Sequence, residues 1–194
     1  MDRSVEAAGK EPVCSLLPFH TKKAAIVTTG SEVQKGLIKD TFTPVLKEKL
    51  FEYNVQVIGQ TLPGDDRQTI TSDILHFIEE GADLILCSGG MSVDPDDRTP
   101  GAIKDTGADI VTYGAPVLPG AMLLLAYYHK DGRTIPVIGL PGCVMYARRT
   151  VFDLILPRIM ADDPVRADEI CAYGEGGLCL NCDVCTFPAC GFGK

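Results

Sequence analysis

Apolar positions in the middle of the chain follow two patterns: short continuous runs, which are typical of buried strands, and helical spacing, which is typical of amphipathic helices. The run at 23–29 is short, apolar and rich in β-branched residues, and it ends at a glycine. Residues 44–53 then place apolar side chains at helical spacing. The same order recurs when a run at 55–61 is followed by 66–80, where isoleucine and phenylalanine repeat at helical intervals. The pattern predicts strands that alternate with helices.

This alternation continues to about residue 160. It predicts, in order, a strand at 83–87, a short helix near 99–106, a strand at 109–113, an apolar stretch at 118–128, a strand at 136–140 and a final helix near 143–160. Parallel strands need crossover connections, which place helices over both faces of the sheet. We therefore expect a three-layer α/β/α domain with a mainly parallel sheet.

The two ends of the chain differ from this middle part. Residues 1–20 are polar, contain Pro12 and Pro18, and show no sustained periodicity. We interpret them as a linker or as the remnant of a missing N-terminal region. The predicted domain occupies 21–162, and 163–194 form a cysteine-rich C-terminal tail.

Charge and hydropathy narrow the range of partners. The 194-residue chain is 45% hydrophobic, enough for one full core, and its formal net charge is −8. No basic patch compensates this acidity, which argues against nucleic acid and membrane surfaces as partners. The chain lacks a long apolar run, and its first residues lack the pattern of a secretion signal. The composition predicts a soluble cytoplasmic protein.

Ligands of open α/β sheets bind beyond the carboxyl ends of the strands, so the loops that follow the strands are the places to search. The first strand leads into Thr29, Gly30, Ser31 and Glu32. The amides and hydroxyls of this loop suit an anion, and its carboxylate suits a cation. Tight turns of these residue types also arise from packing alone, so both interpretations stay open.

The loop after the strand at 83–87 is richest in candidate chemistry. Adjacent glycines allow a ligand to approach the backbone, serines supply hydroxyls, and crowded carboxylates suit a Mg²⁺ ion that serves a phosphorylated substrate. These residues are Ser88, Gly89, Gly90, Ser92, Asp94, Asp96 and Asp97. We assign Asp97 to function and interpret Asp96 as a solvated carboxylate. The alternative is that Asp97 or Thr99 caps the next helix.

The last predicted strand turns through Gly139, Pro141 and Gly142 into the final helix, which again directs amides toward the ligand edge. Asp66 precedes the predicted helix at 66–80 and is expected to cap it. The chain contains neither a dinucleotide-binding fingerprint nor a P-loop, and no histidine accompanies a serine elbow. The common nucleotide-binding and serine hydrolase explanations are therefore excluded.

Taken together, these loops resemble the ordered motifs of the molybdenum cofactor biosynthesis domain family. The matching segments are TTGSEV, PGDDRQTI, LILCSGGMSVDPDDRTP, VLPGAM and IGLPGCVMY, within roughly residues 23–160. The resemblance implies a three-layer α/β fold that binds the molybdopterin dithiolate through its phosphate, as a trimer or dimer. It also implies Mg²⁺ and adenylated intermediates in the enzymatic branches, and molybdoenzymes or other proteins of the cofactor pathway as partners.

The resemblance assigns site residues as well. Asp97 matches an aspartate tied in the family to catalysis and metal binding, and in an enzyme Asp97 and Glu32 would position Mg²⁺ or molybdate. The residues assigned to pterin binding are Thr29, Gly30, Ser31, Ser88, Gly89, Gly90, Ser92, Thr99, Gly139, Pro141 and Gly142. The departures from the family pattern are Ser31 for aspartate, Phe42 for asparagine, Cys143-Val144 for asparagine-proline, and the absence of lysines around Pro119-Gly120. These departures favour binding over catalysis.

The tail carries a separate motif. Of the eight cysteines, Cys179, Cys182, Cys185 and Cys190 follow the spacing Cys-x2-Cys-x2-Cys-x4-Cys. Four thiols at this spacing suit a Zn²⁺ ion or an iron–sulfur cluster. The alternative is a disordered tail with reduced thiols.

Three functions follow from these observations. The leading one is a molybdopterin-binding protein of cofactor synthesis, maturation or delivery, and, if it is an enzyme, an adenylyltransferase-like or molybdenumtransferase-like transferase. The second is a non-catalytic carrier or sensor of the cofactor. The third is a metal-dependent regulatory or scaffold protein in which the cysteine tail dominates.

Overall fold

A computed structural model describes residues 14–194, so most of the predicted N-terminal linker lies outside the described part. The strands are β1 (Lys23–Thr29), β2 (Gln56–Gly64), β3 (Leu84–Ser88), β4 (Asp109–Tyr113), β5 (Leu124–Lys130) and β6 (Arg133–Leu140). The helices are α2 (Ser31–Gln34), α3 (Phe42–Phe51), α4 (Arg67–Glu79), α5 (Thr99–Asp105), α6 (Val151–Met160) and α7 (Ala167–Ala172), with short 3-10 helices η1 (Gly142–Met145) and η2 (Tyr173–Glu175). Within residues 14–194, no helix has the length and apolar character that crossing a bilayer requires.

The six strands form one sheet in the order β2-β1-β3-β6-β5-β4. Strands β2, β1, β3 and β6 are parallel, and β5 and β4 extend the sheet with antiparallel pairing. Strands β5 and β6 are joined at Asp131 and Gly132, which both have the positive φ that tight two-residue hairpin turns require. Because this turn was not recognised in the sequence, the prediction starts β6 three residues too late.

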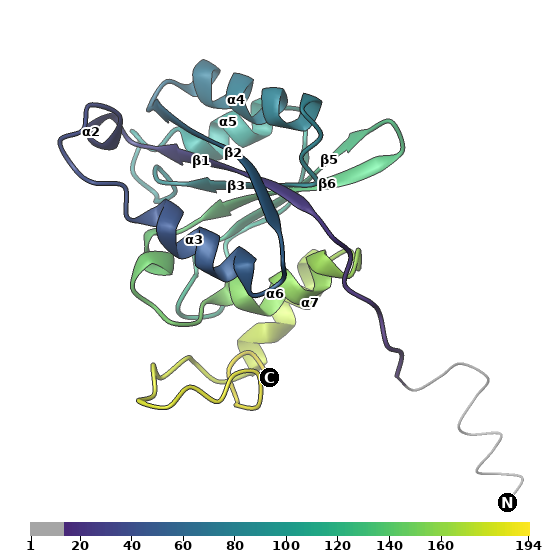
Figure 1. Cartoon of the computed structure of the whole chain (residues 1–194). Helices are drawn as coiled ribbons and strands as arrows, with labels where there is room; N and C mark the ends of the chain where they lie inside the picture. The colour runs from purple at the N-terminus through teal and green to yellow at the C-terminus, as the bar shows by residue number, and fades with distance from the viewer. Residues whose placement is uncertain (1–13) are drawn as a thin grey trace, which may run out of the picture.

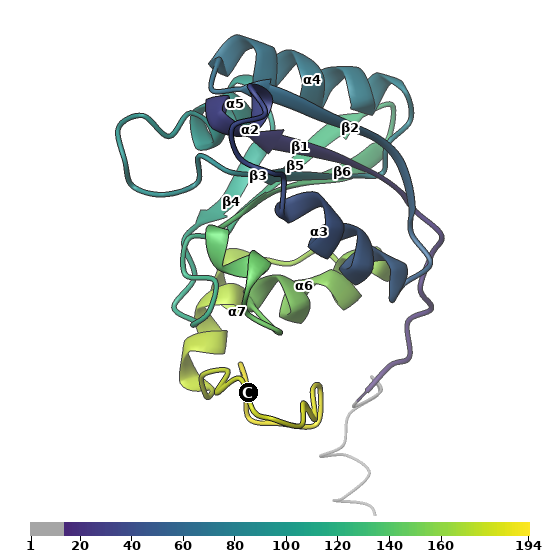
Figure 2. The same cartoon turned by 60° about the vertical axis from the view of Figure 1, so that its left-hand side comes forward.

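Helices cover both faces of the sheet (Figures 1 and 2): α4 and α5 lie over one face, and α3 and α6 over the other. Side chains of β1 alternate between the two cores. Ala24 and Ile26 pack with α3 and α6, whereas Ala25 and Val27 pack with α4 and α5. A strand buried on both faces reads as a continuous apolar run, as this one does. The expected three-layer fold with a mainly parallel sheet is confirmed.

The final helix predicted at 143–160 is two separate elements. The 3-10 helix η1 ends at Met145, and α6 begins after Thr150. The Asp153 carboxylate accepts a hydrogen bond from the Thr150 backbone N–H (2.7 Å), and the Thr150 side chain completes a capping box. This capping box fixes the start of α6, so the residues between Met145 and Val151 do not join η1 and α6 into one helix.

The tail after residue 162 packs against the core beneath α6. Val165, Ile170 and Phe192 are buried in the same apolar cluster as the inner face of α6. The backbone N–H of Cys179 donates to the carbonyl of Leu118 (3.1 Å), which ties the tail to a loop of the domain. These contacts attach the tail to the domain, so the alternative of a disordered tail finds no support. The domain boundary at 162 stays a prediction.

Candidate functional site

A pocket of about 320 Å³, here called the strand-end pocket, lies where β3 and β6 end. It is lined by Phe42, Gly89, Gly90, Met91, Ser92, Asp97, Met122, Pro141 and Gly142. The two loops after these strands contribute Met91, three glycines, Ser92, Asp97 and Pro141 to the lining. Among the described lining residues, Asp97 carries the one charged side chain. The structure thus brings part of the predicted set together in one cavity, namely Gly89, Gly90, Ser92, Asp97, Pro141 and Gly142. Ser88, Thr99 and Gly139 do not line it.

The glycines after β3 are required by the backbone and by a close approach. Gly89 and Gly90 have φ values of +83° and +53°, a region that other residues rarely adopt. A Cβ atom at Gly89 would lie 2.3 Å from the carbonyl oxygen of Thr29. The end of β1 and the start of this loop therefore touch through their backbones, which leaves no room for a side chain between them.

The hydroxyls of three predicted site residues form buried hydrogen bonds that connect the loops of the pocket wall. Thr29, Ser88 and Thr99 are buried, and none of them lines the strand-end pocket. The Thr99 hydroxyl donates to the carbonyl of Gly89 (2.8 Å) and lies 3.0 Å from the Thr29 hydroxyl. The Ser88 hydroxyl donates to the hydroxyl of Thr28 (3.2 Å). These side chains position the loops, and a direct contact with a ligand stays a prediction.

Asp97 closes the β3 loop. Its carboxylate accepts a hydrogen bond from the Ser92 backbone N–H, and its own N–H donates to the carbonyl of Asp94 (3.0 Å). The Tyr113 hydroxyl donates to the carbonyl of Ser92 (3.0 Å), and burial together with the Asp97 charge raises the pKa of Tyr113. The N-cap position of α5 belongs to Arg98, so the alternative that Asp97 or Thr99 caps this helix is wrong.

The loop after β1 lies outside the pocket lining. Gly30 has φ +129° and donates its N–H to the carbonyl of Gly64 (3.2 Å). The N–H of Ser31 donates to the carboxylate of Asp65 (2.8 Å), and Glu32 is exposed. The amide that was expected to face an anion is thus occupied by a carboxylate, and the structure does not place Glu32 on the wall that Asp97 lines.

Asp65 binds the loop after β1, a role that the sequence analysis did not predict. The role of its neighbour Asp66 as a helix cap was predicted correctly. Asp66 caps α4 by accepting from the Thr69 backbone N–H (2.8 Å), and hydrogen bonds from Thr69 hold the pKa of Asp66 below its ordinary value. Paired aspartates before a helix were the available signal. One of them caps the helix, which leaves the other free to bind a neighbouring loop.

The apolar part of the pocket was also missed. Phe42, Met91 and Met122 line it. Gly139 serves this wall indirectly, because a Cβ atom there would lie 2.4 Å from the terminal methyl carbon of Met91. Met91 follows the glycine pair and Met122 ends the segment VLPGAM, so both were within reach of sequence reasoning.

A second cavity of about 410 Å³, here called the tail pocket, lies between the tail and the segment before α6. All four motif cysteines line it, together with Arg148, Arg149, Gly177, Leu178, Leu180, Asn181, Thr186, Phe187, Gly191 and Phe192. Over the described residues 14–194, however, no group of three or more His, Cys, Asp or Glu side chains is placed to hold a metal ion. The predicted zinc or iron–sulfur site in the tail therefore finds no support, because the thiols share a cavity without converging.

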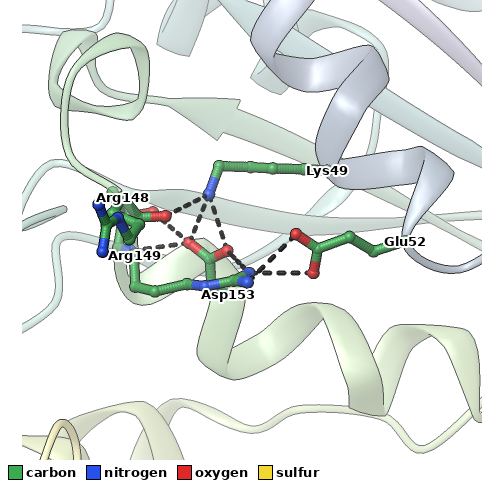
Figure 3. A network of polar contacts seen from close by, with 6 residues as sticks. Lys49, Glu52, Arg148, Arg149 and Asp153 are labelled. Carbon is green, nitrogen blue, oxygen red and sulfur yellow. Dashed lines mark hydrogen bonds and ion pairs between the residues drawn. The ribbon is translucent and has the colours of Figure 1, made fainter. Parts of the chain in front are cut away.

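Charged side chains join this tail pocket to α3 (Figure 3). The Lys49 ammonium donates to both carboxylate oxygens of Asp153 (2.8 and 3.0 Å) and to the carbonyl of Arg148 (3.1 Å). Arg149 pairs with Asp153 and with Glu52, both at 3.0 Å. Burial lowers the pKa of Arg149, but the bonds to Glu52 and Asp153 outweigh that effect and raise it overall.

Comparison with known proteins bears on both the fold and the family. A family model described as "Probable molybdopterin binding domain" matches residues 25–161. The chain is 38% identical over 77 residues to a "CinA-like protein" of Mycolicibacterium gilvum, and 36% identical over 77 residues to one of Mycobacterium tuberculosis. Each match takes in 40% of this chain and only 18% of the relative's length.

Solved structures share the fold at low sequence identity. The tungsten cofactor synthesizing protein MoaB of Pyrococcus furiosus superposes with a TM-score of 0.61 at 20% identity, covering 72% of this chain and 92% of that one. The protein CinA of Thermoplasma acidophilum, described as having unknown function, superposes with a TM-score of 0.56 at 21% identity, covering 72% and 98%. At these identities the likeness establishes the fold alone.

Proposed function

Because this chain belongs to the family of probable molybdopterin binding domains, we propose that its strand-end pocket binds the phosphorylated pterin of molybdenum cofactor biosynthesis. The observation that carries the proposal is the shared cavity at the ends of β3 and β6, walled by Gly89, Gly90, Pro141 and Gly142. Glycine loops expose backbone N–H groups at close range, which is how α/β folds hold phosphate.

The charge of the wall defines how the phosphate would be held. Among the residues that the structure describes, Asp97 is the only one that lines the pocket with a charged side chain, and a carboxylate repels a phosphate. A single carboxylate together with substrate oxygens and water is a usual environment for Mg²⁺. We therefore propose that Asp97 and the pterin phosphate share Mg²⁺, with the loop amides as the remaining partners.

A non-catalytic carrier or sensor is the second candidate, and Phe42 favours it. Phe42 stands where the family pattern has an asparagine, and its side chain lines the strand-end pocket. An aromatic ring at this position packs against a pterin but offers no hydrogen bond to a reacting group. A transferase and a carrier would therefore bind the same ligand and differ in turnover.

The test is calorimetric titration of the full chain with molybdopterin, with and without Mg²⁺ and ATP. We expect saturable binding that Mg²⁺ strengthens, and a further change with ATP only if the protein is a transferase. In Asp97→Asn the Mg²⁺ effect should be lost while binding itself survives, because asparagine keeps an acceptor for the Ser92 N–H.

The matched control is Asp96→Asn. Asp96 lies in the same loop, its side chain is 95% exposed, and it does not line the pocket. Equal behaviour of the two variants would contradict the role given to Asp97, and no binding by the unaltered chain would contradict the proposed function.

A further inference from the structure

The tail pocket brings together reactive groups that pterin binding does not use. Cys179, Cys182, Cys185 and Cys190 all belong to the wall of one cavity, although they come from an irregular segment without helix or strand. Cys182 and Cys185 are exposed, and the other two are partly buried. Two exposed thiols separated by two residues are close enough in the chain to form a disulfide.

Fixed positive charge lies beside these two thiols. Arg148 donates from Nη1 to the carbonyls of Cys182 (3.1 Å) and Asp183 (3.3 Å), so its guanidinium is held against the segment between the cysteines. The guanidinium carbon of Arg149 lies 5.0 Å from the centroid of the Phe187 ring. Phe187 follows Cys185 by two residues, so a second arginine lies next to this segment. Neighbouring guanidinium groups favour the thiolate of Cys185, and the thiolate is the nucleophilic form of cysteine.

We propose that the tail pocket is a thiol–disulfide exchange site for small anionic disulfides, in which Cys185 is the attacking thiol and Cys182 resolves the mixed disulfide. The exposed guanidinium of Arg148 gives such a substrate a partner for its carboxylates. The proposal is independent of pterin binding, because it concerns a different cavity.

The attacking role falls on Cys185 because this exposed cysteine lies in the chain between the two carbonyls that Arg148 binds and the Phe187 ring that Arg149 covers. The backbone N–H of Phe187, followed by the side chain of Arg149 and the charge of Arg148, lowers the pKa of Cys185 below the ordinary thiol value. Burial has the opposite effect on Cys87 and Cys143, whose pKa values are raised. A thiolate that is both accessible and stabilised is the preferred nucleophile.

The exchange balances in two steps. The Cys185 thiolate attacks one sulfur of the incoming disulfide, so that a mixed disulfide forms and one thiolate leaves. The Cys182 thiolate then attacks the Cys185 sulfur and releases the second thiolate. The two leaving thiolates take up the two protons lost by the cysteines. The protein pair is oxidised by two electrons, and the small disulfide is reduced to two thiols.

The experiment treats the reduced full chain with oxidised glutathione and maps each cysteine by mass spectrometry, after the metal content of the sample has been measured. We expect a disulfide between Cys182 and Cys185. The variant Cys182→Ser should stop at glutathione bound to Cys185, and Cys185→Ser should form neither product. The control Cys171→Ser, which alters an exposed cysteine outside the pocket, should behave like the unaltered chain.

The charge preference is tested separately. Oxidised glutathione should react several-fold faster than the neutral hydroxyethyl disulfide, and Arg148→Gln should remove most of that difference without lowering the urea midpoint. Uniform glutathione labelling of Cys14, Cys171 and Cys185 would overturn the proposal. So would a metal ion that protects the four pocket thiols until a chelator removes it, because the cysteines would then be ligands.

Discussion

The strand-end pocket and the tail pocket are walled by different parts of the chain. Backbone dominates the first: glycines with positive φ, carbonyls in contact, and buried hydroxyls that fasten one loop to the next. Side chains dominate the second, where thiols face a cavity and arginines are held by carboxylates and carbonyls. The first wall is fixed by local conformation, and the second depends on charges that come from α3, from the segment before α6 and from the start of α6.

This difference predicts which substitutions disrupt each pocket. A wall made of backbone is disrupted when a side chain is added or a buried hydroxyl is lost. A wall made of charged side chains fails when one partner is removed and its counter-charge stays behind. The predictions below test the two kinds of failure, starting with the largest expected effect.

Removal of the Asp153 charge should be the most damaging change. Lys49 and Asp153 are 6% and 3% exposed, so Asp153→Asn leaves a buried ammonium without its anion and weakens the capping box of α6. We expect the free energy of unfolding to fall by about 3–5 kcal/mol in urea denaturation. The double variant with Lys49→Met should lose clearly less than the sum of the two single changes, and strict additivity would contradict a coupled pair.

A methyl group at Gly89 should cost about 3 kcal/mol, because it combines backbone strain with a contact of 2.3 Å to the Thr29 carbonyl. The matched control is Gly107→Ala. Gly107 has nearly the same φ, +85°, but nothing lies within 4 Å of an added Cβ, so its cost should be about 1 kcal/mol. Urea denaturation separates the two, and equal costs would mean that the close approach is unimportant.

Thr99→Val should destabilise the fold by about 1–2 kcal/mol, because the carbonyl of Gly89 loses its buried donor. The same variant should bind molybdopterin more weakly in a titration, since Gly89 and Gly90 line the strand-end pocket. Thr99→Ser keeps the hydroxyl and should retain the affinity. If both variants bind as tightly as the unaltered chain, the Thr99 hydroxyl does not position the β3 loop.

The exposed pair Arg67–Asp105, between α4 and α5, should show the smallest effect. Hydrogen bonds from Arg67 lower the pKa of Asp105 from its ordinary 3.8. The pair therefore stabilises the fold at pH values above about 4 and stops doing so as the pH falls through the lowered value. Arg67→Met should cost far less than Asp153→Asn at pH 7, and the difference from the unaltered chain should vanish in acid or high salt.

The strands, the main helices and the β3 loop could be predicted because their signals are local. Apolar runs mark the strands from β1 to β4, and adjacent glycines mark Gly89 and Gly90. The break between η1 and α6 was missed because it depends on the capping box of Thr150 and Asp153, which apolar spacing does not reveal.

The parts of the site that could not be predicted depend on tertiary contacts. Nothing near Ser31 in the sequence indicates that Asp65 binds its N–H, and nothing in α3 indicates that Lys49 meets Asp153. For the same reason, cysteine spacing predicted a common location for the tail thiols but not their lack of convergence. Spacing describes a segment, and convergence depends on what that segment packs against.

The stretch from Pro141 to Arg149 contributes to both cavities. Pro141 and Gly142 line the strand-end pocket, and Arg148 and Arg149 line the tail pocket. A ligand that shifts this stretch in one cavity alters the binding free energy in the other, and thermodynamic reciprocity requires the two changes to be equal. If both proposed sites bind and the stretch shifts on binding, a ligand in the strand-end pocket changes the reduction potential of the Cys182–Cys185 pair, and oxidation of that pair acts on the strand-end pocket as a covalent allosteric effector.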